Sequence, residues 1–343
     1  MQAGPDASPS RHDASARLDA ADESRVLYRH MVTLRLLSAR MVDLQRTSKV
    51  ALHTSCLGEE AVIVAAALAA RESDWVFPGA REWGAAIVRG LPIEAYVHHA
   101  FGTSHDVAKG HSAPDHPPAR QYRVGPASGV AGAHVPQAVG AAWAAKIKKD
   151  DVATIAVFGD AANGTGDLHN ALNFAGVFKP ACVFVCRVDG RVPRTTHDRA
   201  VAYGLASARV DGSDVLAVLA LVRAALARAT SGQGATLIEA DTHPLTPTLA
   251  DEIWQRGGAE LLALGDTDPL VVLRRALERD KLLDAAADEA IARDVRAAID
   301  AAVGAAEQAA PPARATMFED VYAKVPAHLE AQQAQKESAT WAR

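Results

Sequence analysis

The sequence predicts an α/β fold, with a mostly parallel sheet that helices cover on both faces. Apolar runs alternate with helical patterns between residues 151 and 241, which is the arrangement that produces parallel sheets. The chain has 343 residues, of which 49% are hydrophobic, so it is long enough for one large α/β domain or two ordinary ones.

The predicted elements begin with helices. Apolar residues at helical spacing predict a helix over residues 25–46, and the Ala-rich segments 58–70 and 136–149 predict two more. A short strand is expected within residues 74–82. Residues 102–134 are rich in Gly, Pro, His and Ser without clear periodicity, and so long a loop suggests a binding role.

The alternating part follows. Apolar runs at 152–158 and 181–190 predict two strands, joined by a helix over 168–177. A short strand comes next, followed by "RVDG" (209–212). A helix over 215–227 and a last strand in "ATLIEAD" (235–241) follow.

Composition divides the chain into four parts. Residues 1–24 are polar and are expected to form a disordered arm, and 25–268 form the α/β domain. Residues 269–330 form a helical segment of the same subunit, and 331–343 form a loose tail. The helical segment carries one apolar stripe, made by Ile291, Val295, Ile299 and Val303.

Charge and cysteine content exclude several classes of protein. The net charge of −5 argues against a nucleic-acid partner. We expect no membrane segment, because no apolar stretch reaches about 18 residues, and no secretory signal. Cys182 and Cys186 lie about 13 Å apart in the predicted strand, too far to bridge. With Cys56 they are expected to be buried thiols, and the protein to be cytoplasmic.

Two aspartates follow the first two strands of the alternating part. Asp160 comes directly after one strand, and Asp189 ends the next strand 29 residues later. In a parallel βαβ unit both strands end at the same edge of the sheet, where ligands bind. Two carboxylates 4 Å apart would repel by about 4 kcal/mol, and a divalent cation such as Mg²⁺ would remove that cost.

A phosphate group would suit the same edge. Gly159, Gly164 and Gly166 let the backbone approach a phosphate, and Arg187 can supply a bidentate contact. The alternative is that the aspartates are helix-cap or turn residues, and this alternative is favoured on the pair alone. Dinucleotide-binding and P-loop motifs are missing, so those interpretations are disfavoured.

The segment 159–190, "GDAANGTGDLHNALNFAGVFKPACVFVCRVDG", resembles the thiamine-diphosphate motif of the 2-oxo acid dehydrogenases. From about Val26 to Gln332 the chain resembles the alpha subunit of their decarboxylating component, in segments such as "SCLGEEA", "VFPGARE" and "VPQAVGAA". The resemblance implies a thiamine-diphosphate-binding fold. It also implies oxidative decarboxylation of pyruvate or a branched-chain 2-oxo acid, with acyl transfer to lipoyl.

The resemblance also implies site residues. Asp160 and Asp189 would bind Mg²⁺ together with the backbone carbonyl of Arg191, while Arg81 and Arg187 would hold the diphosphate. The other positions matched to the cofactor site are Gly129, Ala131, Gly159, Ala161 and Ala162.

Several matching positions depart from the family pattern. Ala161 stands where the motif has Gly, and its methyl group approaches the place of the aminopyrimidine, an overpacking that costs about 1–3 kcal/mol. Val188 replaces an Asn, and "GVA" at 129–131 replaces Ser-Pro-Leu. The cofactor site is therefore expected to be diverged.

The catalytic residue is unknown at this level. The family's active-site loop carries a His, and this chain has Thr248 or a neighbour at that position. His243, five residues away, and His134, which replaces a Gln, are the candidates. For His116, in the loop 102–134, a loop-stabilising role is expected.

The resemblance implies partners, because the family's catalytic Glu belongs to a separate beta subunit. We expect two alpha and two beta chains with the cofactor at their interface, a lipoyl acyltransferase core as acceptor, and a small 2-oxo acid substrate. The alternative is a catalytically impaired paralogue that acts as a structural or regulatory subunit. A stand-alone decarboxylase is disfavoured, because such chains carry both halves.

Overall fold

The computed structural model describes residues 20–190, 195–245, 265–318 and 320–338. At its centre is a five-stranded sheet with strand order β1-β2-β3-β5-β4, in which every neighbouring pair is parallel. The strands are β1 (Trp75–Pro78), β2 (Thr154–Gly159), β3 (Cys182–Asp189), β4 (Ala206–Asp211) and β5 (Thr236–Thr242). The predicted α/β fold with a parallel sheet is confirmed.

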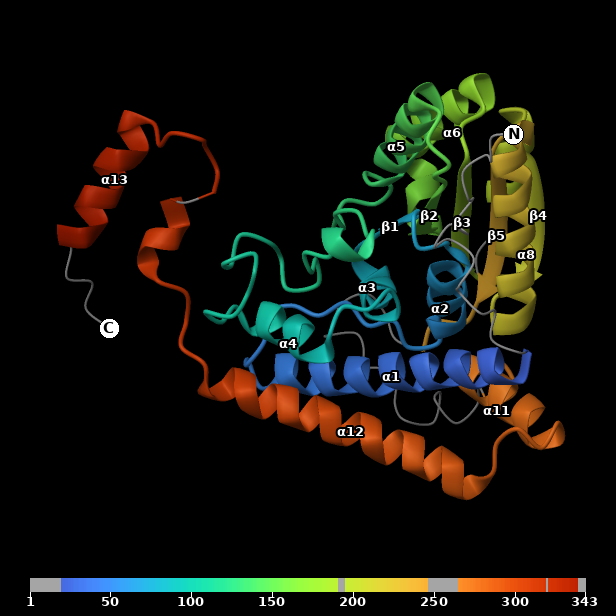
Figure 1. Ribbon diagram of the computed structural model, residues 1–343, viewed down its shortest axis with the longest axis horizontal. Coiled ribbons are helices and arrows are strands. Elements are labelled where there is room, and N and C mark those ends of the chain that lie inside the picture. The colour runs from blue at the N-terminus through green and yellow to red at the C-terminus, as the bar shows by residue number, and fades with distance from the viewer. Residues whose placement is uncertain (1–19, 191–194, 246–264, 319, 339–343) are drawn as a thin grey trace, which may run out of the picture.

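Helices cover both faces of the sheet, as Figure 1 shows. Ile155 and Val157 of β2 belong to one apolar core and the alternate residues Ala156 and Phe158 to the other, because successive side chains of a strand point to opposite faces. The first core is covered by α2 (Glu60–Ala69) and α8 (Val215–Arg228), and the second by α5 (Val135–Lys148), α6 (Gly166–Phe178) and α7 (Thr196–Ala202).

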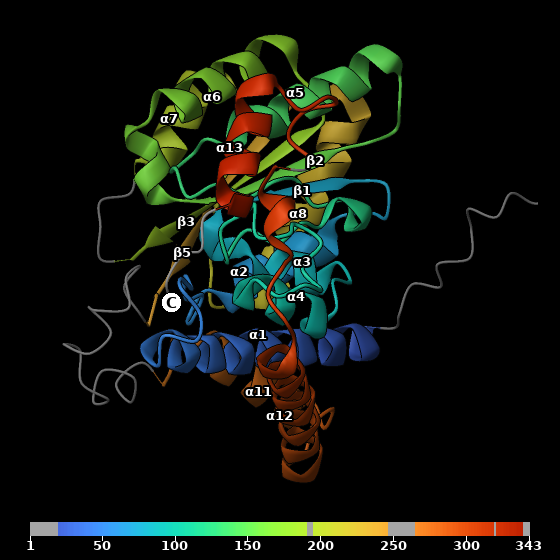
Figure 2. The same ribbon diagram turned by 90° about the vertical axis from the view of Figure 1, so that its left-hand side faces the viewer.

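A second helical layer lies outside α2. The long helix α1 (Ala20–Arg46) packs against α2, α11 (Pro269–Arg279) and α12 (Ala285–Gln308), and it lies beside α12 in Figures 1 and 2. The helix begins at Ala20, so it extends into the segment that we expected to be an arm.

The apolar stripe of the carboxyl-terminal segment is confirmed. Val295, Ile299 and Val303 are buried on α12, and Ile291 is partly buried against the same core. Beyond α12 the chain turns away from the sheet to α13 (Ala327–Ser338), which stands apart from the body in Figure 1. Helical structure thus continues past the boundary that we predicted at residue 330.

The elements between β1 and α5 are less regular. Two short helices, α3 (Gly84–Val88) and α4 (Ile93–Phe101), follow β1 and were not predicted from the sequence. Residues 102–134 contain one turn of 3-10 helix, Arg120–Tyr122, in agreement with the long loop that we expected there.

One segment contradicts our expectation that no apolar stretch reaches about 18 residues. Val215–Gln233 comprises 19 residues and is apolar enough to cross a membrane by length and composition. In this structure Val218, Leu219 and Val222 pack into the core that lies between the sheet and α2. Because its apolar side faces that core, the segment is accounted for as a covering helix of a parallel sheet.

The cysteines are buried as predicted. Cys56, Cys182 and Cys186 are all unpaired and buried. Burial raises the pKa of Cys182 and of Cys186 to about 12, so both thiols stay protonated at neutral pH.

Candidate cofactor site

The two aspartates lie at the carboxyl edge of the sheet. Gly159 of β2 is in register with Arg187 of β3, so the two strands end side by side. Asp160 begins the 3-10 helix that follows β2, and Asp189 is the last residue of β3. The sheet therefore brings both carboxylates to one edge, as the spacing predicted.

Asp160 does not cap the helix that follows it. Thr165 has that role, because its hydroxyl accepts a hydrogen bond from the backbone N–H of Leu168 at 3.3 Å. Within the described part of the chain, Asp160 has no hydrogen-bond or ion-pair partner and is half-buried. The capping alternative therefore does not apply to Asp160.

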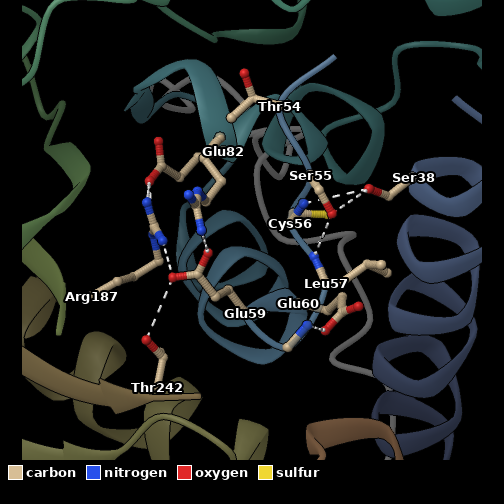
Figure 3. A network of polar contacts seen from close by, with 12 residues as sticks. Ser38, Thr54, Ser55, Cys56, Leu57, Glu59, Glu60, Glu82, Arg187 and Thr242 are labelled. Carbon is tan, nitrogen blue, oxygen red and sulfur yellow. Dashed lines mark hydrogen bonds and ion pairs between the residues drawn. The ribbon is translucent and has the colours of Figure 1, made fainter. Parts of the chain in front are cut away.

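Beside the aspartates lies a row of four alternately charged side chains, of which Glu59, Glu82 and Arg187 are labelled in Figure 3. The Nε of Arg187 donates to Glu82 at 2.7 Å, and its Nη1 donates to Glu59. The Nη1 of Arg81 donates to the second carboxylate oxygen of Glu59 at 2.9 Å. Glu59 and Glu82 are only 3% and 1% exposed. We call these four residues the ionic chain.

Three elements contribute to the ionic chain. Glu59 directly precedes α2, where the helix dipole favours a negative charge. Arg81 and Glu82 lie on the 3-10 helix (Ala80–Glu82) that follows β1, and Arg187 comes from β3. The ionic chain thus crosses the edge of the sheet, from the start of the covering helix α2 to the central strand β3.

The adjacent acid Glu60 has a different role. It binds Arg35 of α1, with 2.5 Å between Nε and Oε1, and so faces away from the ionic chain. Gly58 makes this turn possible, because its φ of +87° favours glycine and an added Cβ would lie 2.3 Å from the carbonyl oxygen of His243.

The charges of the ionic chain stabilise one another. Burial alone would raise the pKa of Glu59, but Arg187 and Arg81 hold it below its ordinary value. Burial would likewise lower the pKa of Arg187, but Glu59 and Glu82 raise it. Glu59 and Arg187 are therefore charged at neutral pH, and the formal charge of the four side chains sums to zero.

The arginines suit a diphosphate. Both lie at the carboxyl edge, and a Cβ on Gly159 would lie 3.4 Å from Nη2 of Arg187, so glycine leaves that approach open. Guanidinium groups bind phosphate oxygens bidentately. Glu59, which already pairs with both arginines, is the feature of the site that opposes an added anion.

The residues suit a magnesium ion only in part. Asp160 and Asp189 supply two carboxylates, which fit the oxygen preference of Mg²⁺. Arg191, the predicted third ligand, lies outside the described residues. In the described ranges no group of three or more His, Cys, Asp and Glu could hold a metal.

The other half of the predicted cofactor site is more open. Gly129 and Ala131 are exposed with the rest of the "GVA" segment, and Ala161 is exposed too. Ala162 and Val188, by contrast, are buried in the core under α5 and α6. The methyl group of Ala161 therefore faces space that a ligand could fill, whereas Val188 packs as a core residue.

His134 lies at the start of α5, next to the ionic chain. Its Nε2 donates to the carbonyl of Val157 at 2.9 Å, and its buried Nδ1 has no partner among the residues described. Burial lowers the pKa of the ring, so it is neutral near pH 7. A Cβ on Gly79 would lie 3.2 Å from the ring and 2.7 Å from the carboxylate of Glu82, so glycine is needed between them.

The second candidate histidine lies at the end of β5. A Cβ on Gly190 would lie 3.0 Å from Cε1 of His243, so this ring borders the turn that follows Asp189. Thr248, at the position of the family's loop histidine, falls outside the described residues.

The sequence did not reveal an Asp–His pair in the loop 102–134. Nδ1 of His116 lies 2.5 Å from the buried carboxylate of Asp115, which also accepts a hydrogen bond from Thr54 at 2.5 Å. A Cβ on Gly129 would lie 3.9 Å from Nε2 of His116, so the ring faces the "GVA" segment. We expected His116 only to stabilise the loop, but a histidine oriented by a carboxylate can also hold a proton.

Glu59 and Glu82 were also missed. Both occur in the quoted segments "SCLGEEA" and "VFPGARE", but nothing in local spacing pairs them with Arg187, which is 128 residues from Glu59 and 105 from Glu82. The sequence offered one signal for them: each is an acidic residue within a segment that resembles the family.

Comparison with known proteins agrees with the fold. Residues 28–314 match the family described as "Dehydrogenase E1 component". The chain is 36% identical to a 3-methyl-2-oxobutanoate dehydrogenase subunit alpha of Mycobacterium tuberculosis, over 97% of this chain and 91% of the relative. It is 32% identical to a 2-oxoisovalerate dehydrogenase subunit alpha of Bacillus subtilis, over 92% of this chain and all of the relative.

A human relative, the mitochondrial 2-oxoisovalerate dehydrogenase subunit alpha, is 31% identical over 90% of this chain and 72% of its own length. The match to the family covers more than half of the chain, and the similarity to the bacterial relatives covers nearly all of it. The chain belongs to the dehydrogenase E1 component family, as a relative of the alpha subunits of 2-oxo acid dehydrogenases.

Proposed function

We propose that this chain is the alpha subunit of a thiamine-diphosphate-dependent dehydrogenase for a branched-chain 2-oxo acid, such as 3-methyl-2-oxobutanoate. One observation carries the proposal. Arg81 and Arg187 converge at the sheet edge that also bears Asp160 and Asp189, so groups for a diphosphate and for its counter-ion lie together. The names of the relatives support the substrate class.

Each residue has a task in this proposal. Arg81 and Arg187 would hold the diphosphate, and Asp160 and Asp189 would hold Mg²⁺, with the backbone carbonyl of Arg191 proposed as the third ligand. Bound thiamine diphosphate supplies the nucleophilic carbon and the electron sink that decarboxylation of a 2-oxo acid needs. The protein binds and orients that group, while the sheet edge holds its charged end.

The Asp115–His116 pair supports a proton-holding role on the aminopyrimidine side. The buried carboxylate orients the ring through Nδ1, so Nε2 faces the exposed segment around Gly129. A histidine in this arrangement can hold a proton at Nε2 near the place where substrate binds. His116 is thus the residue of this chain that we propose in place of the missing loop histidine.

An exposed apolar surface supports assembly with a beta subunit. Trp143 of α5 packs against Phe174 and Phe178 of α6, with ring centroids 6.5 and 4.7 Å away. Nearby, Ile147 and Val177 are 65% and 66% exposed. Contiguous apolar surface of this kind marks protein interfaces. We propose a tetramer of two alpha and two beta chains in the cytoplasm, which passes acyl groups to a lipoyl acyltransferase core.

The test combines binding and turnover. The chain would be co-expressed with a beta-type chain from the same genome, and release of CO₂ from 3-methyl-2-oxobutanoate and from pyruvate would be measured with thiamine diphosphate and Mg²⁺. We expect turnover of the branched-chain acid that depends on both additions. A folded tetramer that binds thiamine diphosphate but releases no CO₂ would contradict the proposed activity.

A second function is favoured by two features of the site. Val188 packs as a core residue where the family has an anchoring Asn, and Glu59 already neutralises part of the arginine charge. A paralogue that keeps the fold and the α5–α6 surface but has lost the cofactor would serve as a structural or regulatory subunit. Assembly with a beta chain without any binding of thiamine diphosphate is the result that would favour it.

A further inference from the structure

We propose that Glu59 competes with the diphosphate for Arg81 and Arg187, so that this residue sets the affinity of the site for anions. The inference rests on the proposed function, because it assumes that the diphosphate binds at these arginines. It concerns a residue of the ionic chain that the sequence did not single out.

Glu59 bonds to both arginines of the ionic chain. Its Oε2 accepts from Arg81 at 2.9 Å and its Oε1 accepts from Arg187, while Thr242 approaches Oε1 to within 3.5 Å. Arginine uses the same planar N–H groups for carboxylates and for phosphates. A diphosphate that bridges Arg81 and Arg187 would therefore need donors that Glu59 now uses.

Glu82 has a different position. It binds Arg187 through Nε and Nη2, whereas Glu59 binds the same guanidinium through Nη1. Glu82 therefore supports Arg187 from another side. Glu59, in contrast, lies between the two arginines and accepts hydrogen bonds from both.

The groups around Glu59 determine how strongly its negative charge repels an incoming anion. Among the residues that the structure describes, the charged groups that face it are Arg81 and Glu82 from the 3-10 helix and Arg187 from β3. Thr242, from the end of β5, is uncharged, and Glu60 binds Arg35 on the other side of α2.

His134, at the start of α5, lies beside Glu82 and is neutral, because burial lowers its pKa. With the four charged side chains already balanced, a diphosphate adds net negative charge to a buried site. Binding thus requires Glu59 to give up its arginines or to remain beside a second anion, and both weaken binding.

The variant Glu59→Gln tests this. Glutamine has nearly the same shape without the charge, so Glu59 no longer neutralises the positive charge of the two arginines. We expect magnesium diphosphate and magnesium thiamine diphosphate to bind Glu59→Gln, assembled with a beta chain, about tenfold more tightly than they bind the wild-type assembly, a difference of about 1.4 kcal/mol in binding free energy. Isothermal titration calorimetry measures both affinities.

The matched control is Glu239→Gln. Glu239 is fully buried and binds Arg209 at 2.8 Å, so it also belongs to a glutamate–arginine pair. It is in register with Cys186, whereas Arg187 is in register with Ala240, so Glu239 points to the opposite face of the sheet from the ionic chain. We expect Glu239→Gln to bind magnesium diphosphate with the same affinity as wild type.

A second readout separates competition from a supporting role. Without ligand, Glu59→Gln should melt at a lower temperature than wild type, because Arg81 and Arg187 lose a charged partner. Saturating magnesium diphosphate should raise the melting temperature of Glu59→Gln more than that of wild type. Glu59→Asp keeps the charge but is one methylene shorter. It should show an affinity between those of wild type and Glu59→Gln, and it provides the test if Glu59→Gln does not fold.

The outcomes are distinct. If wild type binds thiamine diphosphate and Glu59→Gln binds it equally or more weakly, Glu59 orients the arginines and the inference is wrong while the proposed function stands. If neither wild type nor any variant binds diphosphate or thiamine diphosphate, the proposed cofactor site is wrong and the inference is overturned with it.

Discussion

The Nη1 atom of Arg81 lies 2.9 Å from Oε2 of Glu59, in an ion pair whose side chains are only 14% and 3% exposed. The pair joins the turn after β1 to the start of α2, two segments that are 22 residues apart. It belongs to the ionic chain at the carboxyl edge of the sheet. The same bonds that hold this edge together therefore involve the groups that we propose for diphosphate binding.

The first prediction concerns Arg187. Replacing it with Gln leaves Glu82 buried without its partner, and breaking a buried ion pair in this way typically costs about 3–5 kcal/mol. Urea unfolding followed by circular dichroism measures the loss. Arg223→Gln is the control, because the Arg223 side chain is 46% exposed and such pairs contribute about 0–1 kcal/mol. Equal losses in the two variants would contradict a structural role for the ionic chain.

The second prediction concerns Asp160. Asp160→Asn removes the charge of a carboxylate that has no partner among the residues described, so we expect little change in stability. We expect the affinity for thiamine diphosphate to fall at least about tenfold and to lose its dependence on Mg²⁺. Titrations at several Mg²⁺ concentrations measure both effects. Asp167→Asn, in the first turn of α6, is the control, and a Mg²⁺ dependence that persists in Asp160→Asn would exclude Asp160 as a ligand.

The third prediction concerns pH and the buried ring of His53, whose Nε2 lies 3.0 Å from Oγ of Ser38. Burial lowers its pKa to about 4, although the charge of Asp115 opposes the shift. Between pH 6.5 and 4 the unfolded chain binds a proton that the folded chain does not. Stability therefore falls as the pH falls through this window, and the contribution becomes constant below about pH 4.

The variant His53→Gln isolates this effect. Relative to His53→Gln, wild type should lose about 3 kcal/mol of unfolding free energy between pH 7 and pH 4, and chemical unfolding at several pH values measures the difference. Glutamine keeps a hydrogen-bonding side chain without the titrating ring. Unfolding curves of the two proteins that stay parallel over this range would contradict the prediction.

The fourth prediction concerns the α5–α6 surface. Phe174 is 47% exposed, so Phe174→Asp should leave the melting temperature within a few degrees of wild type. A charge in an apolar interface is left without a partner, and we expect the beta chain to be lost on co-purification. Size-exclusion chromatography with light scattering measures the assembly. Val201→Asp on α7, at a residue that is 57% exposed, is the control, and full assembly by Phe174→Asp would exclude this surface as the contact.

Local sequence was enough for the elements and for one part of the site. The alternation of apolar runs and helical patterns predicted β2, α6, β3, α8 and β5, because strand and helix periodicity are local properties. The same alternation predicted that Asp160 and Asp189 lie at one edge of the sheet, because a right-handed βαβ crossover makes both strands run in the same direction. The short helices α3 and α4 were not predicted, because five and nine residues are too few for a helical period to stand out.

Tertiary structure alone decided the rest of the site. The resemblance assigned Arg81 and Arg187 to a phosphate, but only the folded chain shows that Glu59 and Glu82 bind them from positions up to 128 residues away. The role of Asp115 as the partner of His116 was equally hidden, because a carboxylate becomes a partner only when packing buries it beside a ring. Backbone periodicity is written in neighbouring residues, whereas the pairing of buried charges depends on which elements the core brings together.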